Sequence, residues 1–396
     1  MAKGSHGGLE QRWGSKVRIA MVGTRGVPAR YGGFETAVEE IGKRLAADGH
    51  EVMVYCRGER HPEPEYLGMR LIHLPAIEKK VAETLSHTGL SVAHAFRRKM
   101  AREGADVALL FNAANAPLLP VLRTLRVPVA THVDGLEWKR TKWSGTGQRY
   151  YRAAEAMAVR WSDALIADAV GIQDYYREKF GAESVFIPYG APILTSTDTA
   201  KLAEAGYEPG GYHLVVARFE PENHVHLAVE GYRRSRAEKP LVVVGSAPYA
   251  DAYTERVKEL AGDDPRITFL GGVWDQDLLD ALYAGALTYV HGHSVGGTNP
   301  SLLRAMGAGA SVLAFDVNFN REVLGDEAGR YFADAATLAE RIEAAEADPG
   351  AAADRGDAAR KRAAERYVWD DVAAAYEKLC ADLVERRLTR KTVRPK

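Results

Sequence analysis

The stretch His291 to Ala310, HGHSVGGTNPSLLRAMGAGA, joins a buried strand, a glycine-rich loop and the start of a helix. The apolar run Leu287 to Val290 predicts the strand, and Pro300-Ser301 predicts the first turn of the helix. A helix start offers unpaired N–H donors and the positive end of the helix dipole, and Gly296-Gly297 lets a ligand approach the backbone. The stretch therefore predicts an anion site, with an ordinary strand-to-helix turn as the plain alternative.

The composition sets the class of protein. A chain of 396 residues exceeds one typical core, so we expect two domains, and 46% hydrophobic residues with a formal net charge of −1 indicate a soluble globular protein. The absence of a basic excess argues against a nucleic-acid binder. The two cysteines, Cys56 and Cys380, lie far apart without metal-ligand neighbours, so neither a disulfide nor a zinc site is expected.

No apolar run approaches the roughly 20 residues that span a bilayer. The polar start, residues 1–16, lacks the apolar core of a signal peptide, and we expect it to be a disordered tail. These features predict a cytoplasmic protein, and they leave peripheral contact with the inner face of the membrane open.

The fold proper begins with VRIAMVG, Val17 to Gly23, an apolar run ending in glycine that suits a buried parallel strand. A helix over about Thr36 to Asp48 follows, because its apolar residues recur at helical spacing, and Glu51 to Arg57 returns as a second strand. This β-loop-α-β unit predicts a doubly wound α/β domain.

The loop of this unit does not fit a nicotinamide site. Gly23-x-x-Gly26 lacks the G-x-G-x-x-G spacing, and the second strand ends in Cys56-Arg57 where an acidic ribose ligand is expected. What is left is a loop with Gly26, Gly32 and Gly33 at the mouth of a sheet, the usual ligand position in open α/β folds.

A second informative stretch is Thr131 to Trp143, THVDGLEWKRTKW. His132 and Asp134 follow a strand, and this density of polar and aromatic groups at a strand end is typical of a sugar site. A packing role for each side chain, taken singly, is the open alternative. The helical stretch Leu85 to Met100 ends in a basic cluster, which indicates either a solvated face or attraction to anionic lipid or to a phosphate-bearing acceptor.

The pattern changes between Tyr189 and Gly211, which we interpret as the interdomain connection. A second α/β alternation begins at Tyr212, so the two halves look alike in architecture. A long amphipathic helix over 367–388 and a basic end over 389–396, expected to be a disordered tail, close the chain.

Four motifs, in order, carry a family resemblance: GTRGVPARYGGFE, VDGLEWKR, VARFEPEN and HGHSVGGTNPSLLRAM. From Val17 to about Leu388 the chain resembles a retaining GT-B glycosyltransferase of family four, in particular the bacterial rhamnosyltransferase-like subgroup of cell-wall and capsule assembly. The resemblance implies two facing Rossmann-like α/β domains, the acceptor-side one over 17–195 and the donor-binding one over 205–366. It also implies that the last helix, 367–388, crosses back to the first domain.

The resemblance also implies the site. Charge on the leaving diphosphate would be stabilised by side-chain cations and a helix start, with no metal and no cofactor. The implied catalytic residues are Asp134 and His132, which position acceptor or sugar hydroxyls, and Arg218, which matches the family's diphosphate-contacting arginine; no protein nucleophile is assigned. The implied donor-binding residues are Gly32, Gly33, Arg218, Glu222, Asn223, His293, Ser294, Gly296, Gly297, Thr298, Asn299, Pro300, Ser301 and Arg304. The expected acceptor-side residues are Glu137, Trp138, Lys139 and His87.

Two departures from the family pattern concern the donor. Gly296 and Arg304 stand where the family has two glutamates, and an arginine cannot accept hydrogen bonds from ribose hydroxyls. The family's lysine soon after the arginine is also missing, because Glu220 to Asn223 occupies that region. Either Arg304 reaches a phosphate, or the donor is bound differently.

The sequence thus predicts a transferase that moves a sugar from a nucleotide-diphosphate donor, dTDP-L-rhamnose or a UDP-sugar, to a saccharide, lipid-linked or small-molecule acceptor. Two alternatives stay open: a non-catalytic module of the same fold that binds a saccharide or a partner, and a nucleotide-sugar epimerase. No nucleic-acid partner is expected.

Overall fold

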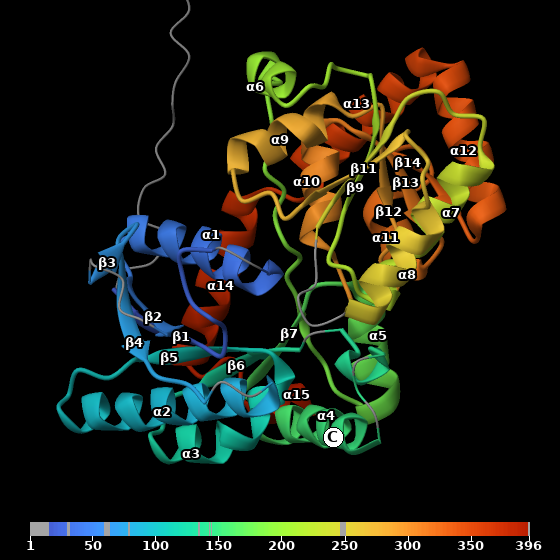
Figure 1. The fold of residues 1–396 in the computed structure, drawn as a ribbon. Coiled ribbons are helices and arrows are strands. Elements are labelled where there is room, and N and C mark those ends of the chain that lie inside the picture. Colours follow the sequence, from blue (N-terminus) through green and yellow to red (C-terminus); the bar gives the residue numbers. More distant parts are fainter. Residues whose placement is uncertain are drawn as a thin grey trace, which may run out of the picture.

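The computed structural model describes residues 16–29, 32–58, 64–77, 80–133, 135–141, 143, 145–245 and 251–394. These residues form two α/β domains, each built on its own sheet, and the domains meet along one side of each (Figure 1). The N-terminal tail expected over residues 1–16 lies outside the described residues except for Lys16.

The first domain contains a sheet in the order β3-β4-β2-β1-β5-β6-β7-β8. All pairs are parallel except β3 with β4, which confirms the predicted doubly wound arrangement. The strands are β1 (Arg18–Val22), β2 (Glu51–Arg57), β3 (Glu65–Tyr66), β4 (Met69–Leu74), β5 (Val107–Phe111), β6 (Val129–His132), β7 (Ala164–Ala167) and β8 (Val185–Phe186).

Helices cover both faces of this sheet, because alternate residues of its buried strands point to opposite sides. Ile19 and Met21 of β1 pack in a core with α1 (Gly33–Ala47), whereas Ala20 and Val22 pack in a second core. The helices facing that second core are α2 (Lys80–Met100), α3 (Leu119–Thr124), α4 (Gly145–Trp161) and α5 (Val170–Phe180), with the short 3-10 segments η1 (Ala113–Leu118) and η2 (Glu137–Lys139) in the connections.

Helix α1 (Gly33–Ala47) begins three residues before the predicted Thr36. Its N-cap is Gly32, which has a φ of 109°, a conformation that glycine adopts without strain. The glycine pair therefore ends the loop and starts the helix, so that the loop and the helix start lie together at the carboxyl edge of the sheet.

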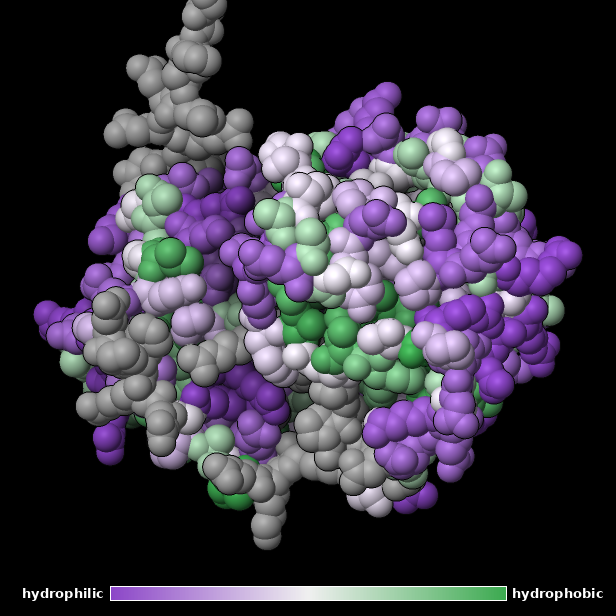
Figure 2. All heavy atoms as spheres, turned by 45° about the horizontal axis from the view of Figure 1, so that its top comes forward, coloured by the Kyte–Doolittle hydropathy of each residue, from purple (hydrophilic) through white to green (hydrophobic). Residues whose placement is uncertain are grey.

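The second domain repeats the plan with a fully parallel sheet in the order β11-β10-β9-β12-β13-β14. Hydrophilic side chains dominate the outer rim of this domain in Figure 2, as expected for helices whose apolar residues face inward. Its strands are β9 (His213–Val216), β10 (Leu241–Val244), β11 (Ile267–Gly271), β12 (Thr288–His291), β13 (Ser311–Phe315) and β14 (Gly329–Phe332). Its helices are η3 (Pro221–Asn223), α7 (Val225–Arg234), α8 (Asp251–Ala261), α9 (Gln276–Gly285), α10 (Pro300–Ala308), α11 (Asn318–Leu324), α12 (Ala335–Ala347) and α13 (Pro349–Arg366).

The chain passes between the domains twice. The predicted connection contains one short helix, α6 (Thr199–Glu204), and the chain later returns through α14 (Trp369–Val384), which lies beside α1 (Figure 1). Arg44 Nε on α1 lies 2.6 Å from Asp370 Oδ1, and His50 Nε2 lies 3.1 Å from Glu377 Oε1. The long C-terminal helix therefore packs on the first domain, as the resemblance implied.

The expectation of a disordered tail over 389–396 was wrong for its described part. Residues Arg390–Val393 form α15, whose Val393 side chain is 2% exposed in the second core of the first domain. The Val393 carbonyl accepts a 2.8 Å hydrogen bond from the Glu183 backbone N–H. The buried Val393 side chain and this backbone hydrogen bond hold the segment on the first domain. No helix in the described part of the chain is long and apolar enough to cross a bilayer.

Candidate active site

The carboxyl edges of the two sheets meet, and glycines make the contact possible. A Cβ on Gly33 would lie 2.9 Å from Pro300 Cγ at the start of α10, and a Cβ on Gly135 would overlap the backbone of Gly296. Real Cβ atoms do not come this close, so a side chain at either position would push the domains apart. Glycines predicted from both domains therefore do lie together at the interface.

The loop between β12 and α10 has the predicted strand-loop-helix form. Gly296 has a φ of 137°, and a Cβ on Gly297 would overlap the Asp168 carboxylate of the first domain. The Thr298 hydroxyl donates a 2.6 Å hydrogen bond to the Asp168 carbonyl. The loop is thus held against the other domain at the residue that follows β7.

The start of α10 is capped by its own side chains. Asn299 Oδ1 accepts hydrogen bonds from the Ser301 backbone N–H at 2.9 Å and from the Ser301 hydroxyl at 2.8 Å. The Tyr289 hydroxyl lies 3.1 Å from the Ser301 hydroxyl. These two predicted donor residues therefore shape the helix start.

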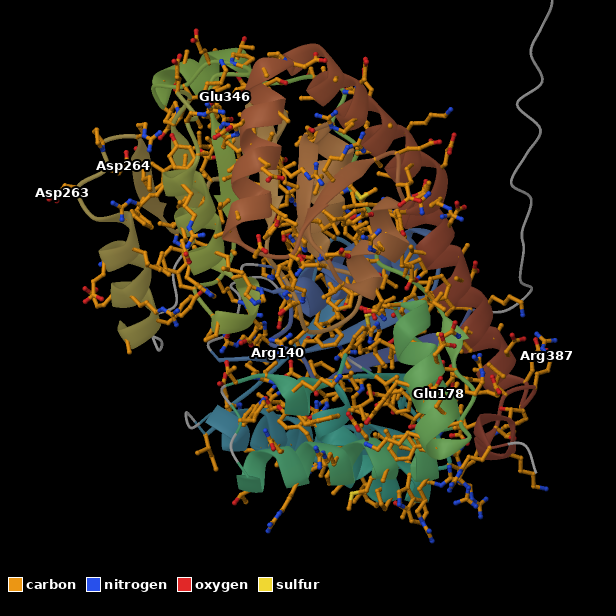
Figure 3. The ribbon with its side chains drawn as sticks, turned by 90° about the vertical axis from the view of Figure 1, so that its right-hand side faces the viewer. Arg140, Glu178, Asp263, Asp264, Glu346 and Arg387 are labelled. Carbon is orange, nitrogen blue, oxygen red and sulfur yellow. The ribbon has the colours of Figure 1, made fainter. Side chains whose placement is uncertain are left out.

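Two arginines from different domains share one carboxylate. Arg218 Nη2 lies 3.5 Å from Glu220 Oε2, and Arg140 Nη1 of the first domain lies 3.9 Å from the same oxygen. Arg140 is held from behind by Glu137, whose Oε1 lies 2.9 Å from Arg140 Nε. Figure 3 shows Arg140 where the two domains meet. Two arginines and two carboxylates, Glu220 and Glu137, therefore meet between the domains, and the carboxylates fix both guanidinium groups in place.

His293 is kept neutral beside these arginines. Burial, together with the nearby charges of Arg140 and Arg218, lowers the pKa of His293 well below its ordinary value. The Asn223 amide nitrogen donates to the Arg218 carbonyl at 2.8 Å, so its oxygen faces His293 Nδ1 at 2.7 Å. Nδ1 must therefore carry the proton, and Nε2 is left as an acceptor next to Gly296.

Glu222 and Ser294 brace the site rather than point into it. The Thr141 hydroxyl of the first domain donates a 2.9 Å hydrogen bond to Glu222 Oε2. The backbone N–H and the hydroxyl of Ser294 both reach the Glu222 carbonyl, at 2.9 and 3.0 Å. Both residues lie at the predicted place, and their polar groups hold two loops and the two domains together.

His132, at the end of β6, is surrounded by aromatic rings. Phe34, Phe111 and Tyr189 lie with their ring centroids 5.1 to 5.9 Å from the imidazole. Burial lowers the pKa of His132 to about 3, so the ring is neutral at physiological pH. Its Nδ1 has no hydrogen-bond partner among the described residues. A neutral His132 can exchange hydrogen bonds with a ligand but does not act as a cation. Asp134, the other predicted positioning residue, lies outside the described residues.

The predicted acceptor-side residues Glu137, Trp138 and Lys139 contact other side chains of the protein. The Glu137 carboxylate forms an ion pair with Arg140 and accepts a 3.3 Å hydrogen bond from Trp143 Nε1–H. Trp138 lies under the Arg152 guanidinium, 4.2 Å from the ring centroid, and Lys139 lies 5.6 Å from the same ring.

His87 is fully buried and lies 3.0 Å from the Cys56 carbonyl through Nε2, and burial lowers its pKa to about 4. The contacts of Trp138 and His87 favour the packing role that the sequence had left open for single residues of this kind.

Arg304 does not extend toward a phosphate as a lone cation. It forms an ion pair with Asp280 of the neighbouring helix α9, and both side chains are partly exposed. The sequence had placed a cation where a carboxylate was expected. The structure shows a carboxylate in direct contact with that cation, one helix away.

Several residues of the site were not predicted, among them Arg140, Glu220 and Asp168. Arg140 stood inside the EWKR motif, and its polar neighbours were the available signal. Glu220 and Asp168 follow strands, but their importance depends on how the domains face each other, which no local pattern encodes.

Comparison with known proteins agrees with this geometry. Residues 201–362 match the family model "Glycosyl transferases group 1", and residues 16–192 match "Domain of unknown function (DUF1972)". Glycogen synthase of Mycobacterium tuberculosis is 26% identical over 394 residues, which cover 91% of this chain and 93% of the relative.

Two solved structures show the same fold. Sucrose-phosphate synthase from Thermosynechococcus elongatus has a TM-score of 0.78 at 23% identity and covers 94% of this chain and 100% of its own. Anabaena HepE in complex with UDP-glucose has a TM-score of 0.75 at 16% identity, with 92% and 100% covered. The two facing domains thus have the fold of GT-B glycosyltransferase structures, and the second domain matches the family model "Glycosyl transferases group 1" over residues 201–362.

Proposed function

We propose that this glycosyltransferase moves a sugar, with retention of anomeric configuration, from a nucleoside-diphosphate donor to a saccharide, lipid-linked or small-molecule acceptor. The observation that carries the proposal is the meeting of Arg218 and Arg140 at Glu220, beside the Gly296-Gly297 loop. The UDP-glucose complex of Anabaena HepE supports a UDP-sugar. The sequence resemblance to rhamnosyltransferases supports dTDP-L-rhamnose as the other donor.

In this proposal the two arginines stabilise the negative charge that develops during the reaction. When the bond between the anomeric carbon and the diphosphate oxygen breaks, negative charge grows on the leaving group. Cations fixed by Glu220 and Glu137 are oriented before the reaction, so they lower the barrier without reorganisation. In this proposal the arginines supply the charge that a metal ion supplies elsewhere, and turnover continues in the presence of a chelator.

His132 and Asp134 belong to the sugar side of the proposed site. Because His132 is neutral, it holds a hydroxyl by hydrogen bonding and does not carry a proton to the leaving group. The departing phosphate oxygen takes the proton of the incoming acceptor hydroxyl on the same face of the sugar. This route gives retention without a protein nucleophile.

Asp280 supplies the carboxylate for the donor ribose in this proposal. Arg304 and the Gln276 amide both donate to Asp280 Oδ1, and the side chain is about one quarter exposed, so Oδ2 remains to accept from a hydroxyl. The pair thereby restores the acceptor that Arg304 itself cannot provide.

The test is a donor screen followed by product analysis. The protein is incubated with UDP-glucose, dTDP-L-rhamnose and GDP-mannose, and release of free nucleotide is measured with and without a chelator. We expect one donor to release nucleotide. If that donor is α-linked, the product should also be α-linked, which NMR of the product measures. An inverted product would contradict retention, and isomerised donor with no released nucleotide would favour an epimerase.

A further inference from the structure

One layer of the first domain faces away from the second domain. Helices α2, α3 and α4 lie along the lower side of the molecule in Figure 1, and α15 packs against α4 and β7. The inner sides of these helices fill the second core of the first domain. Their outer sides form a continuous surface, here called the basal face, which is distinct from the interdomain site.

The basal face carries large apolar side chains on its outside. Leu90, Phe96 and Met100 of α2 are 42%, 45% and 72% exposed. With the exposed Ala93 between them, they recur three or four residues apart, so they form one stripe along the helix. Val121 of α3 and Met157 of α4 add exposed side chains at 46% and 39%. An outward stripe of this kind marks a contact surface more often than a solvent face.

The charge of the basal face is one-sided. Residues 80–103, 113–126, 145–161 and 386–394 contain three acidic residues, Glu83, Glu103 and Glu155, of which Glu103 alone is exposed. Glu83 pairs with Arg57 and Glu103 with Arg98, and the Glu155 carboxylate, 3% exposed, accepts a hydrogen bond from the Tyr175 hydroxyl. The same segments present several exposed basic side chains: Arg97, Arg102, Arg149, Arg152, Arg160 and Lys391. Since the whole chain has 52 basic and 53 acidic residues, this bias is local to the face.

We propose that the basal face docks the protein on an anionic lipid surface. The apolar stripe would enter the boundary between headgroups and acyl chains, while the arginines bind lipid phosphates on either side. A polynucleotide would use the arginines but leave the stripe exposed to water, and a neutral protein partner would use the stripe but leave the arginines without counter-charges. A lipid surface satisfies both features at once.

Docking by this face has a consequence that rests on the proposed transferase activity. Helix α2 extends from Lys80 to Met100, and its His87 side chain contacts the carboxyl end of β2. The stripe begins at Leu90, about one turn from the edge of the sheet where ligands bind. A lipid-linked acceptor held under α2 would therefore have its polar head close to the site.

The experiment is co-sedimentation of the full chain with vesicles of phosphatidylcholine alone or with about 30% phosphatidylglycerol. We expect binding only to the anionic vesicles, and loss of binding as salt rises from about 0.1 M to 0.5 M, because screening weakens the arginine contacts. Removing two charges, Arg97→Ser with Arg102→Ser, should lower the partition coefficient about 25-fold, at about fivefold per charge. Phe96→Glu with Met100→Glu should lower it more than tenfold at about 0.1 M salt.

The controls are Trp274→Glu, at a 70% exposed aromatic residue of the second domain, and Lys361→Ser, at an exposed residue of α13. Both should bind vesicles like the wild type, and every variant should keep wild-type circular dichroism and nucleotide binding. Failure to bind anionic vesicles, or an equal loss in the controls, would overturn the proposal. A dimer that Phe96→Glu dissociates would instead assign the face to a second copy of the chain. None of these outcomes depends on the transfer reaction.

Discussion

Arg140 of the first domain and Arg218 of the second reach the same carboxylate oxygen of Glu220, at 3.9 and 3.5 Å. Neither domain alone contains this arrangement, so the charge of the site exists only when the domains face each other. In the proposed function, the reaction and the domain contact are coupled through Glu220.

Replacing Arg140 should show this coupling. We expect Arg140→Ala to lower kcat/KM for the sugar nucleotide about 10² to 10³-fold, the usual effect of removing one preorganised charge donor from a transition state. Arg236→Ala, at an exposed arginine paired with Glu343 on the second domain, should change it less than twofold. Steady-state kinetics on folded variants measures this difference. Equal kcat/KM values for Arg140→Ala and the wild type would show that Arg140 takes no part in the reaction.

Asp280 gives a test of ribose recognition. Asp280→Asn should raise KM for the donor about tenfold or more, because a charged acceptor is lost, and should abolish the preference for a nucleotide over its matching deoxynucleotide. Asp277→Asn on the same helix is the control, since Asp277 is exposed and contacts Lys201. If Asp280→Asn keeps the wild-type preference, the ribose is recognised elsewhere.

The close approach of Gly135 to Gly296 predicts an effect on closure. In Gly135→Ala the added methyl would collide with the opposite backbone, so the domains would meet in an altered position and kcat should fall about 10²-fold. Gly145→Ala places the same methyl where no described atom lies within 4 Å, and it should be neutral. A fully active Gly135→Ala protein would show that this contact is dispensable.

His132 predicts a pH dependence of stability. Its folded pKa of about 3 lies below the unfolded value of about 6.5, so below pH 6.5 the unfolded state binds more protons and stability falls as the pH drops. His132→Phe, which matches the aromatic surroundings, should remove this contribution. The slope of the free energy of unfolding against pH should then decrease by about 1.4 kcal/mol per pH unit between pH 6 and 4. Urea unfolding at several pH values measures it, and parallel curves for the two proteins would contradict the neutral assignment.

Much of the fold could be predicted from sequence because it is local. Apolar runs such as Val17 to Gly23, each followed by an amphipathic helix, indicate parallel strands and their crossovers, and the glycine loop before Pro300 indicates a ligand edge. The crossing helix also agrees with the structure.

The parts that could not be predicted depend on tertiary packing. The pairing of Arg304 with Asp280 requires the packing of α10 against α9, and the reach of Arg140 requires a particular domain orientation. The basic C-terminal end becomes ordered because Val393 finds a pocket formed by distant residues. No periodicity in the chain encodes these contacts.

The most direct test of the central claim is calorimetric binding of UDP, dTDP, GDP and ADP to the wild type, Arg218→Ala and Arg140→Ala. The account predicts that one nucleotide, UDP or dTDP, binds the wild type, and that each variant weakens this binding at least tenfold, as expected when a charge-assisted contact is lost. Binding that is unchanged in both variants, or no binding of any nucleotide to the wild type, would contradict a donor site built from these two arginines.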